Sequence, residues 1–480
     1  MSIQTSPEVQ NEIKTQVLVL GAGPGGYTGA FRAADLGKSC VMVERQWTGE
    51  VCLNVGCIPS KAHLHVAKVI EDAAGSDAFG LSFAKPSIDI KKLADWKNAL
   101  VQRLRKGIEG LAKQRKVQII QGEGFFESPH SVLVQTAKGQ TRIIFEQALI
   151  AVGSEPVSLP FLPKDPRIMD SSAALELKDI PERLLVIGGG IIGLEMATVY
   201  QALGSRISIV ELTETLLMGM DPDIVAPLHK RLQNQYEAIF LKTGVSEVIA
   251  KSDGLWVRFK GPNVPEAPQR FDRILVAVGR RSNAPLIQAD KAGLSVDERG
   301  FIAVDRQQRS AVPHIFAVGD VVGNPMLAHK AVAQAKIAAE VIAGQKHYFE
   351  PKGIPSVAYT DPEVASVGLS EAEAKAQGIA YRKAIFPWMA NGRSLSLGRE
   401  EGLTKLIVDA ASNRVLGAAI VGPQAGDLIA EVALAIEMGC EAQDLALTIH
   451  PHPTLSETVA LAAEMIEGSI TDLFLPKGPT

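Results

Sequence analysis

The stretch TQVLVLGAGPGG at residues 15–26 decides the fold class. Its first half, residues 15–20, is a short run of leucine and β-branched residues, which predicts a buried parallel strand. Gly21, Gly23 and Gly26 follow at G-x-G-x-x-G spacing. In this pattern the first glycine makes a tight turn, the second lets the backbone approach a pyrophosphate, and the third lets a helix pack against the strand. The stretch therefore predicts a dinucleotide-binding βαβ unit.

A second copy of this pattern starts at residue 184. A predicted strand at 184–187 leads into Gly188, Gly190 and Gly193, and the two copies are in register because 188 − 21 = 167 and 211 − 44 = 167. A lone motif of this kind is often only a glycine-rich turn. Two complete copies, each with strand, glycines and helix, predict two bound dinucleotides.

An acidic residue closes each copy. Glu44 lies 18 residues after Gly26 (44 − 26), and Glu211 lies 18 residues after Gly193 (211 − 193), each following a second predicted strand. An acid at this distance binds the ribose hydroxyls of a dinucleotide. Because a carboxylate repels the 2′-phosphate of NADP, Glu211 predicts that the second site prefers NAD. Arg206 precedes its strand and is expected at the surface.

A close cysteine pair follows the first copy, in EVCLNVGCIPSK at residues 50–61. In an ideal helix, residues five apart have Cα atoms roughly 8.6 Å apart, as Cys52 and Cys57 would. A disulfide needs less than about 7 Å, so the oxidised segment must be distorted, and distorted disulfides are the labile, redox-active ones. Gly56 supplies the flexibility, whereas Lys61 and the helix that starts near it favour a thiolate.

The pair therefore predicts redox chemistry. Electron exchange between cysteines and a nicotinamide needs a two-electron mediator, so a flavin is expected beside the pair. Two alternatives are a plain buried thiol pair and a metal site, although the metal site would lack C-x-x-C spacing and a second ligand cluster. Its ligands would be Cys52, Cys57, His63 and His65.

Composition sets outer limits on function. The 480 residues suggest about three domains. A net charge of −4 argues against nucleic-acid binding by phosphate neutralisation, and no run of about 18 apolar residues predicts a membrane span. Residues 1–14 do not resemble a signal or transit peptide.

Only four cysteines occur, which favours a reducing, cytoplasmic location. The two outside the pair, Cys40 in a core strand and Cys440 in a helix, are expected to serve packing.

The whole chain beyond its N-terminal extension resembles the pyridine nucleotide-disulfide oxidoreductase family, in particular the members that oxidise dihydrolipoamide. The motifs that carry the resemblance are GAGPGG at 21–26, CLNVGCIPSK at 52–61, GGGIIGLE at 188–195, AVGRR at 277–281, HIFAVGDVVGNPMLAHKA at 314–331 and HPHPTLSE at 450–457. The resemblance implies an α/β fold with two Rossmann-like domains, for FAD and NAD, and an α+β C-terminal dimerisation domain. The expected domains are 1–155 (FAD, first part), 156–282 (NAD), 283–350 (FAD and central, second part) and 351–480 (dimerisation).

The resemblance also implies roles for individual residues. Cys57 would lie against the flavin, and Cys52 would exchange with the substrate thiol. Besides the first glycine motif and Glu44, the FAD contacts would be Lys61, Gly124, Asp320 and Ala328. Besides the second glycine motif and Glu211, the NAD contacts would be Glu195, Val245 and Gly279.

A base is expected in the last motif. A thiol substrate must lose a proton, and histidine titrates near neutral pH, so His452 is the candidate base with Glu457 to orient it. The residues alone leave an alternative in which 454–457 is a capping box and Glu457 only caps a helix. His450 is a candidate for a packed, inert histidine. The resemblance implies that His452 serves the disulfide of the other subunit of a homodimer.

The function implied by the resemblance is oxidation of protein-bound dihydrolipoamide to lipoamide with reduction of NAD. The partners would be lipoyl domains and the acyltransferase core of 2-oxoacid dehydrogenase complexes, or the glycine cleavage system. Alternatives are another disulfide reductase of the family, or a non-catalytic FAD- and NADH-binding sensor or scaffold. Two positions depart from the family pattern: Glu50 follows Gly49 where Gly-Gly is usual, and Pro451 stands where alanine is commoner.

Overall fold

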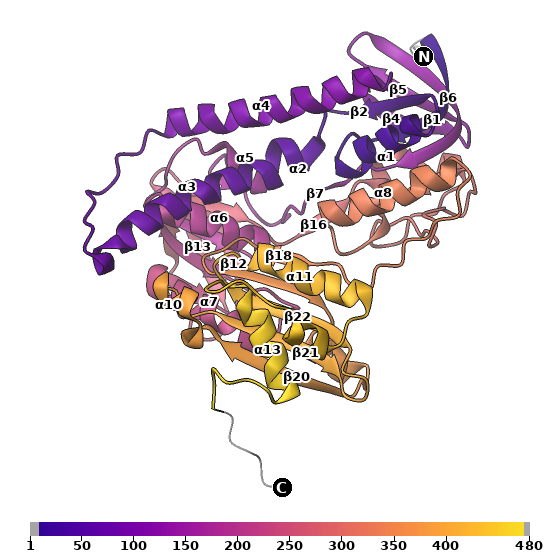
Figure 1. Cartoon of the computed structure of the whole chain (residues 1–480). Helices are drawn as coiled ribbons and strands as arrows, with labels where there is room; N and C mark the ends of the chain where they lie inside the picture. Colours follow the sequence, from indigo (N-terminus) through magenta and orange to yellow (C-terminus); the bar gives the residue numbers. More distant parts are fainter. Residues whose placement is uncertain (1–8, 475–480) are drawn as a thin grey trace.

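A computed structural model describes residues 9–474, which form three main sheets with helices packed on them, a three-stranded layer and a two-stranded ribbon (Figure 1). The first sheet is built around β1 (Val9–Leu20), whose buried half contains the apolar run before the first glycine motif. β1 pairs with β2 (Cys40–Glu44) on one side and with β6 (Gly139–Ile150) on the other, and all three strands are parallel. The remaining strands are β3 (Gln118–Gln121) and β17 (Ile315–Ala317), both parallel, and β4 (Glu123–Ser128) and β5 (Ser131–Thr136), both antiparallel.

Helices α1 (Pro24–Asp35) and α8 (Ala328–Ile342) lie side by side on this sheet, although some 300 residues separate them (Figure 1). Their small residues Gly29 and Ala335 are buried, which lets the two backbones approach closely. The cysteine segment forms α2 (Glu50–Val55) and α3 (Cys57–Gly75), and α4 (Ile90–Gln114) runs back along the outside.

The second sheet repeats the first around the second glycine motif. β9 (Arg183–Ile187) and β10 (Arg206–Val210) are parallel and entirely buried but for their first residues, and α6 (Ile191–Ala202) connects them. The other parallel strands are β8 (Ile168–Met169), β11 (Ala238–Phe240) and β15 (Arg273–Val276). An antiparallel layer packs beside it, formed by β12 (Gly244–Lys251), β13 (Gly254–Lys260) and β14 (Gln269–Phe271).

A short ribbon joins the two parallel sheets. β7 (Ser154–Pro156) pairs antiparallel with β16 (Arg280–Ser282), so the chain enters and leaves the second sheet through neighbouring strands. The third sheet is wholly antiparallel and carries α11 (Ala425–Met438), α12 (Ala442–Leu447) and α13 (Glu457–Glu467). Its strands are β18 (Ser356–Ala358), β19 (Glu363–Gly368), β20 (Tyr381–Pro387), β21 (Leu403–Asp409) and β22 (Val415–Gly422).

The α/β class with two Rossmann-like units and a C-terminal α+β unit is confirmed, whereas the four domain boundaries stay predictions. The expectation that Cys440 lies in a helix is wrong. Helix α11 ends at Met438 because Gly439 adopts a left-handed conformation (φ 72°), the usual way for a helix to stop. Within residues 9–474, no helix combines the length and apolar character that a membrane crossing requires.

Candidate active site

Cys52 and Cys57 lie on either side of a break between two helices. Gly56 forms the break, with φ −146° and ψ −118°. A Cβ atom at this position would lie 2.8 Å from the carbonyl oxygen of Val51, so no larger residue fits. The local distortion that the cysteine spacing predicts is therefore present, and the two thiols are close enough for each to shift the pKa of the other. All four cysteines of the chain are free thiols in the structure.

The two thiols differ in acidity. A hydrogen bond from the Cys52 thiol lowers the pKa of Cys57 to about 7, and the charge of Lys61 acts in the same direction against the effect of burial. The bond to Cys57 and burial raise the pKa of Cys52 above its ordinary range. The pair thus favours one shared proton on Cys52 and a thiolate at Cys57, at the N-terminus of α3.

Lys61 joins this pair to the second Rossmann-like unit. Its Nζ lies 2.9 Å from both carboxylate oxygens of Glu195, a side chain that is only 5% exposed. The same ammonium lies 4.4 Å from the centre of the Tyr359 ring, and the backbone N–H of Tyr359 donates to Glu195. Three elements from different parts of the chain therefore meet beside the cysteines. Nothing in the local sequence pattern points to Tyr359.

His452, in the loop before α13, forms a hydrogen-bonded pair with Glu457, the first residue of that helix. Nδ1 of His452 lies 2.9 Å from Oε1 of Glu457, and Oε2 of Glu457 accepts the backbone N–H of Thr454 at 2.7 Å. Glu457 thus caps the loop and orients the imidazole at once. The capping box at 454–457 is incomplete, because the helix begins at Glu457 with Ser456 as its N-cap, and the Thr454 hydroxyl donates to the Pro451 carbonyl instead.

His450 has a different environment. Its side chain is 7% exposed, Nε2 lies 2.6 Å from Glu431, and Nδ1 lies 2.8 Å from the carbonyl of Thr448. Both ring nitrogens are engaged, in keeping with a packed residue.

The first glycine motif forms a tight cradle. A Cβ atom on Gly21 or Gly26 would lie within 3 Å of the backbone oxygen of Ala151 or Gly21, respectively, so these positions accept only glycine. Gly23 is the N-cap of α1 and provides no side-chain cap, which leaves the first amide groups of the helix available to an anion. Glu44 accepts the N–H of Ala22 at 2.8 Å.

A cavity of about 60 Å³ lies between this motif and β4. Its lining includes Gly21, Glu44, Glu50 and Gly124. The first and last of these are more than 100 residues apart in the sequence. The uncapped helix, the glycine cradle and the acid on β2 fit the pyrophosphate and ribose of a dinucleotide such as FAD.

The second glycine motif repeats this arrangement. Glu211 accepts the N–H of Gly189 at 2.7 Å, as Glu44 accepts that of Ala22, and Gly190 is an N-cap without a side-chain cap. Gly193 packs against Gly188, because a Cβ atom on Gly193 would clash with the backbone oxygen of Gly188.

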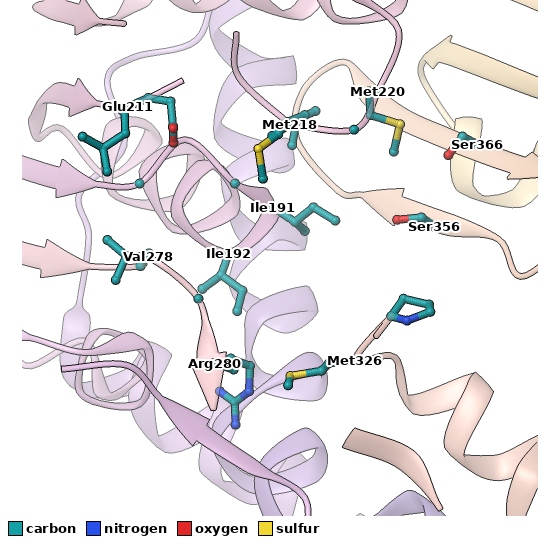
Figure 2. Close-up of a pocket in the computed structure, with 18 of the residues that line it drawn as sticks. Ile191, Ile192, Glu211, Met218, Met220, Val278, Arg280, Met326, Ser356 and Ser366 are labelled. Carbon is teal, nitrogen blue, oxygen red and sulfur yellow. The ribbon is translucent and has the colours of Figure 1, made fainter. Parts of the chain in front are cut away.

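This motif opens onto a cavity of about 890 Å³, in which Glu211 and Val278 lie at the strand ends while Met218 and Met220 face Ser356 and Ser366 (Figure 2). The expected NAD residues that line it are Gly188, Gly190, Glu211, Val245 and Gly279; Gly193 and Glu195 lie outside its lining.

Two expected FAD contacts, Asp320 and Ala328, follow β17 and, like Lys61, lie outside the lining of the small cavity. Asp320 accepts a hydrogen bond from the Ser154 hydroxyl at 2.5 Å, and Arg280 donates to the same hydroxyl at 2.8 Å. Ala328 is the first residue of α8. The AVGRR motif contains Arg280, but its spacing gives no indication that it contacts Ser154.

Comparison with known proteins agrees with this geometry. The pyridine nucleotide-disulphide oxidoreductase family matches residues 15–335, and the dimerisation domain of the same family matches residues 354–463. The chain belongs to the pyridine nucleotide-disulphide oxidoreductases: it is a flavoprotein disulfide oxidoreductase that uses FAD and NAD.

Among curated relatives, the chain is 55% identical to the dihydrolipoyl dehydrogenase of Vibrio cholerae, over 97% of this chain and 98% of the relative. It is 54% identical to that of Haemophilus influenzae (97% and 98%) and 42% identical to that of Geobacillus stearothermophilus (95% and 97%). Among solved structures, the HOCl-induced flavoprotein disulfide reductase RclA from Escherichia coli superposes with a TM-score of 0.84 at 26% identity, covering 94% of this chain and all of that one.

Proposed function

We propose that the chain oxidises dihydrolipoamide carried by lipoyl domains and reduces NAD, as the dihydrolipoyl dehydrogenase component of 2-oxoacid dehydrogenase complexes or of the glycine cleavage system. The observation that carries this proposal is the helix break at Gly56, which places Cys52 and Cys57 on its two sides, with the thiolate favoured at Cys57. The names of the relatives, matched over nearly their full lengths, point to the same substrate.

The reaction exchanges one dithiol for another. With the pair oxidised, His452 takes a proton from one substrate thiol, and the resulting thiolate attacks the sulfur of Cys52 and displaces Cys57 as thiolate. The second substrate thiol, after losing its proton, attacks the mixed disulfide and displaces Cys52. Lipoamide leaves with its disulfide formed, and the protein holds two reduced cysteines that share one proton. FAD held at the first glycine motif would supply a two-electron carrier between this reduced cysteine pair and NAD.

Cofactor contacts follow from the two glycine motifs and the residues brought to them. For FAD we propose Gly21, Gly23, Gly26, Glu44, Lys61, Gly124, Asp320 and Ala328. For NAD we propose Gly188, Gly190, Gly193, Glu195, Glu211, Val245 and Gly279. Cradle geometry and uncapped helices support the glycines, and cavity lining supports Glu44, Gly124, Glu211, Val245 and Gly279. The other residues, Lys61, Glu195, Asp320 and Ala328, are proposed from the family motifs that contain them.

NAD is proposed over NADP because Glu211 stands at the end of β10. Arg206 does not offset the negative charge of Glu211, because it pairs with Glu182 at 2.6 Å. A 2′-phosphate would meet a carboxylate there.

The proposed assembly is a homodimer in which His452 of one subunit serves the cysteine pair of the other. The segment that contains His452 matches a dimerisation domain. Large apolar side chains near it are exposed, Ile449 by 96%, and such surfaces usually mark an interface. The others are Leu434, Met438 and Leu447. We propose a cytoplasmic location from the redox use of few cysteines, and we keep the domain divisions at 155, 282 and 350.

Two measurements test the proposal. The purified holoenzyme should reduce NAD with free dihydrolipoamide, followed by the near-ultraviolet absorbance of NADH, and should not do so with reduced glutathione. Turnover with glutathione alone would favour another reductase of the family, and no turnover with either thiol substrate would favour a sensor or scaffold. Co-purification with an acyltransferase core would identify the complex.

A further inference from the structure

Glu50 is an acidic side chain placed inside the first glycine cradle. It takes a left-handed backbone conformation, φ 46°, which costs a non-glycine residue energy. Its carboxyl group lies against Gly23: a Cβ atom built on Gly23 would lie within 3 Å of Oε2 of Glu50. On the other side, a Cβ atom on Gly153 would lie 3.0 Å from Oε1.

This position is the approach to the uncapped end of α1. Gly23 is the second glycine of the motif, the one whose missing side chain makes room for a pyrophosphate. The Glu50 carboxyl group occupies part of that room and lines the cavity of about 60 Å³ beside Glu44. A dinucleotide that binds at this motif must therefore bring its phosphates next to a carboxyl group.

The surroundings of Glu50 as a whole favour its neutral form. Burial raises the pKa of Glu50 to about 8, and Glu44 and Asp320 add to the shift. Arg45 and Arg280 oppose the shift without reversing it. Those four are the charged groups that bear on Glu50 from β2, from the segment after β17 and from β16. A pyrophosphate would add further negative charge at the same place, which favours the protonated acid more strongly.

We propose that Glu50 is a further cofactor-binding residue, which meets the pyrophosphate of FAD as a neutral carboxylic acid and donates a hydrogen bond to it, so that FAD binding takes up a proton. This inference rests on the proposed FAD site at the first glycine motif. A neutral acid is a hydrogen-bond donor, whereas an ionised one only accepts and would repel phosphate. FAD is consequently held more weakly as the pH rises through the titration of Glu50.

The test measures FAD retention by the holoenzyme. Dilution of the holoenzyme, followed by the fluorescence of released flavin, gives the dissociation constant for FAD from pH 6 to 9. For an acid with a pKa near 8 in the FAD-free protein, the dissociation constant should rise about tenfold between pH 7 and pH 9. Glu50→Gln keeps the size and a hydrogen-bond donor, and Glu50→Gly restores the family residue and relieves the backbone strain. Both variants should show a change of less than about twofold over this range.

Proton exchange gives a second readout. Calorimetry of FAD rebinding in two buffers of different ionisation enthalpy should show uptake of about half a proton at pH 8 in the unaltered protein and close to none in Glu50→Gln. The titration of Cys57 is common to both proteins and cancels in the comparison.

The variant Glu44→Gln distinguishes a failure of the role proposed for Glu50 from a failure of the proposed FAD site. Glu44→Gln should weaken FAD binding about tenfold at neutral pH, as expected for loss of a charged hydrogen bond, while the dependence on pH remains. If Glu44→Gln, folded by circular dichroism, held FAD unchanged, the proposed site would be wrong. If it weakened FAD but the unaltered protein and Glu50→Gln had the same pH profile, Glu50 would bind FAD ionised or turned away, and this inference alone would fail.

Discussion

Nδ1 of His452 lies 2.9 Å from Oε1 of Glu457, while the imidazole side chain as a whole is 79% exposed. With Nδ1 engaged, Nε2 is the nitrogen able to accept a proton, and the carboxylate stabilises the imidazolium that results. An oriented but exposed base suits a substrate that arrives from outside the subunit.

Replacing His452 by glutamine should lower lipoamide turnover by about 10²–10⁴-fold, the usual contribution of general acid–base catalysis. FAD content and the oxidation of NADH by artificial acceptors should stay the same, because neither uses a substrate thiol. Steady-state assays of both reactions on one preparation provide the comparison. A variant with unimpaired lipoamide turnover would rule out His452 as the base.

A mixed dimer tests which subunit supplies the base. A heterodimer of Cys52→Ser and His452→Gln chains, isolated through two different tags, retains one complete site if His452 acts across the interface. We expect about half of the unaltered activity from it. If His452 acted within its own chain, no site would be complete, and the confirmed heterodimer would be inactive.

FAD removal should change which cysteine reacts first. In the reduced holoenzyme we expect iodoacetamide to label Cys52, because FAD in its proposed position would shield Cys57. In the protein stripped of FAD, Cys57 should react first, because it is the more exposed thiol and its pKa is about 7, whereas that of Cys52 is raised. Peptide mapping after brief labelling distinguishes the two sites. Identical labelling with and without FAD would contradict the assigned roles.

The choice of nicotinamide follows from Glu211. We expect kcat/KM for NAD to exceed that for NADP by at least about tenfold, or ~1.4 kcal/mol. Glu211→Arg should narrow the difference, because it replaces a repulsive charge with one that pairs with the 2′-phosphate. Steady-state kinetics with NAD and with NADP, run in parallel, measure the ratio of the two kcat/KM values. Equal use of both nucleotides by the unaltered protein would reject the proposed NAD preference.

Lys405 holds the second and third sheets together from a fully buried position. Its ammonium lies 2.9 Å from carboxylate oxygens of Asp221, Asp223 and Glu371, and the side chain is 1% exposed. Lys405→Met would leave these carboxylates without their shared cation, so we expect a loss of about 3–5 kcal/mol in the free energy of unfolding. Lys383→Met removes an exposed partner of Glu371 and should cost less than about 1 kcal/mol.

This loss should depend on pH. Hydrogen bonds from Lys375 and Lys383, and then from Lys405, hold the pKa of Glu371 far below its ordinary value. A carboxyl group whose pKa is lowered by folding contributes stability above its unfolded pKa and loses it as the pH falls through the folded value. Denaturant unfolding should therefore show the full difference between Lys405→Met and the unaltered protein at pH 7, and a smaller one well below pH 4. A difference that did not change with pH would point to packing alone.

The features that the sequence predicted well are local. Strand, glycine turn, helix and acid follow one another within 30 residues, and the break at Gly56 follows from the spacing of two cysteines. Contacts between distant segments carry no such signal: Lys61 meets Glu195 because α3 packs on α6, and Ser154 meets Asp320 because β6 and β17 are neighbours in the first sheet. For Cys440 a signal was present, since a glycine directly before it is a common helix stop.

Glu50 shows both sides of this limit. The sequence shows that Glu50 replaces the usual glycine, but it does not show where the side chain points. The carboxyl group lies between Gly23 and Gly153, which come from different loops. Only their proximity in the fold turns an unusual residue into one that faces a cofactor site.

The pairing of β7 with β16 makes the second Rossmann-like unit an insertion whose two chain ends lie side by side. Its two ends are neighbours, Ser154 beside Ser282 and Pro156 beside Arg280, while β6 and β17 pair directly in the first sheet. A unit whose ends meet can be removed or exchanged without stretching the chain that hosts it, and the loop it closes leaves the host strands in register. Nucleotide preference could therefore be transplanted between relatives as a single block, with the thiol chemistry of the host unchanged.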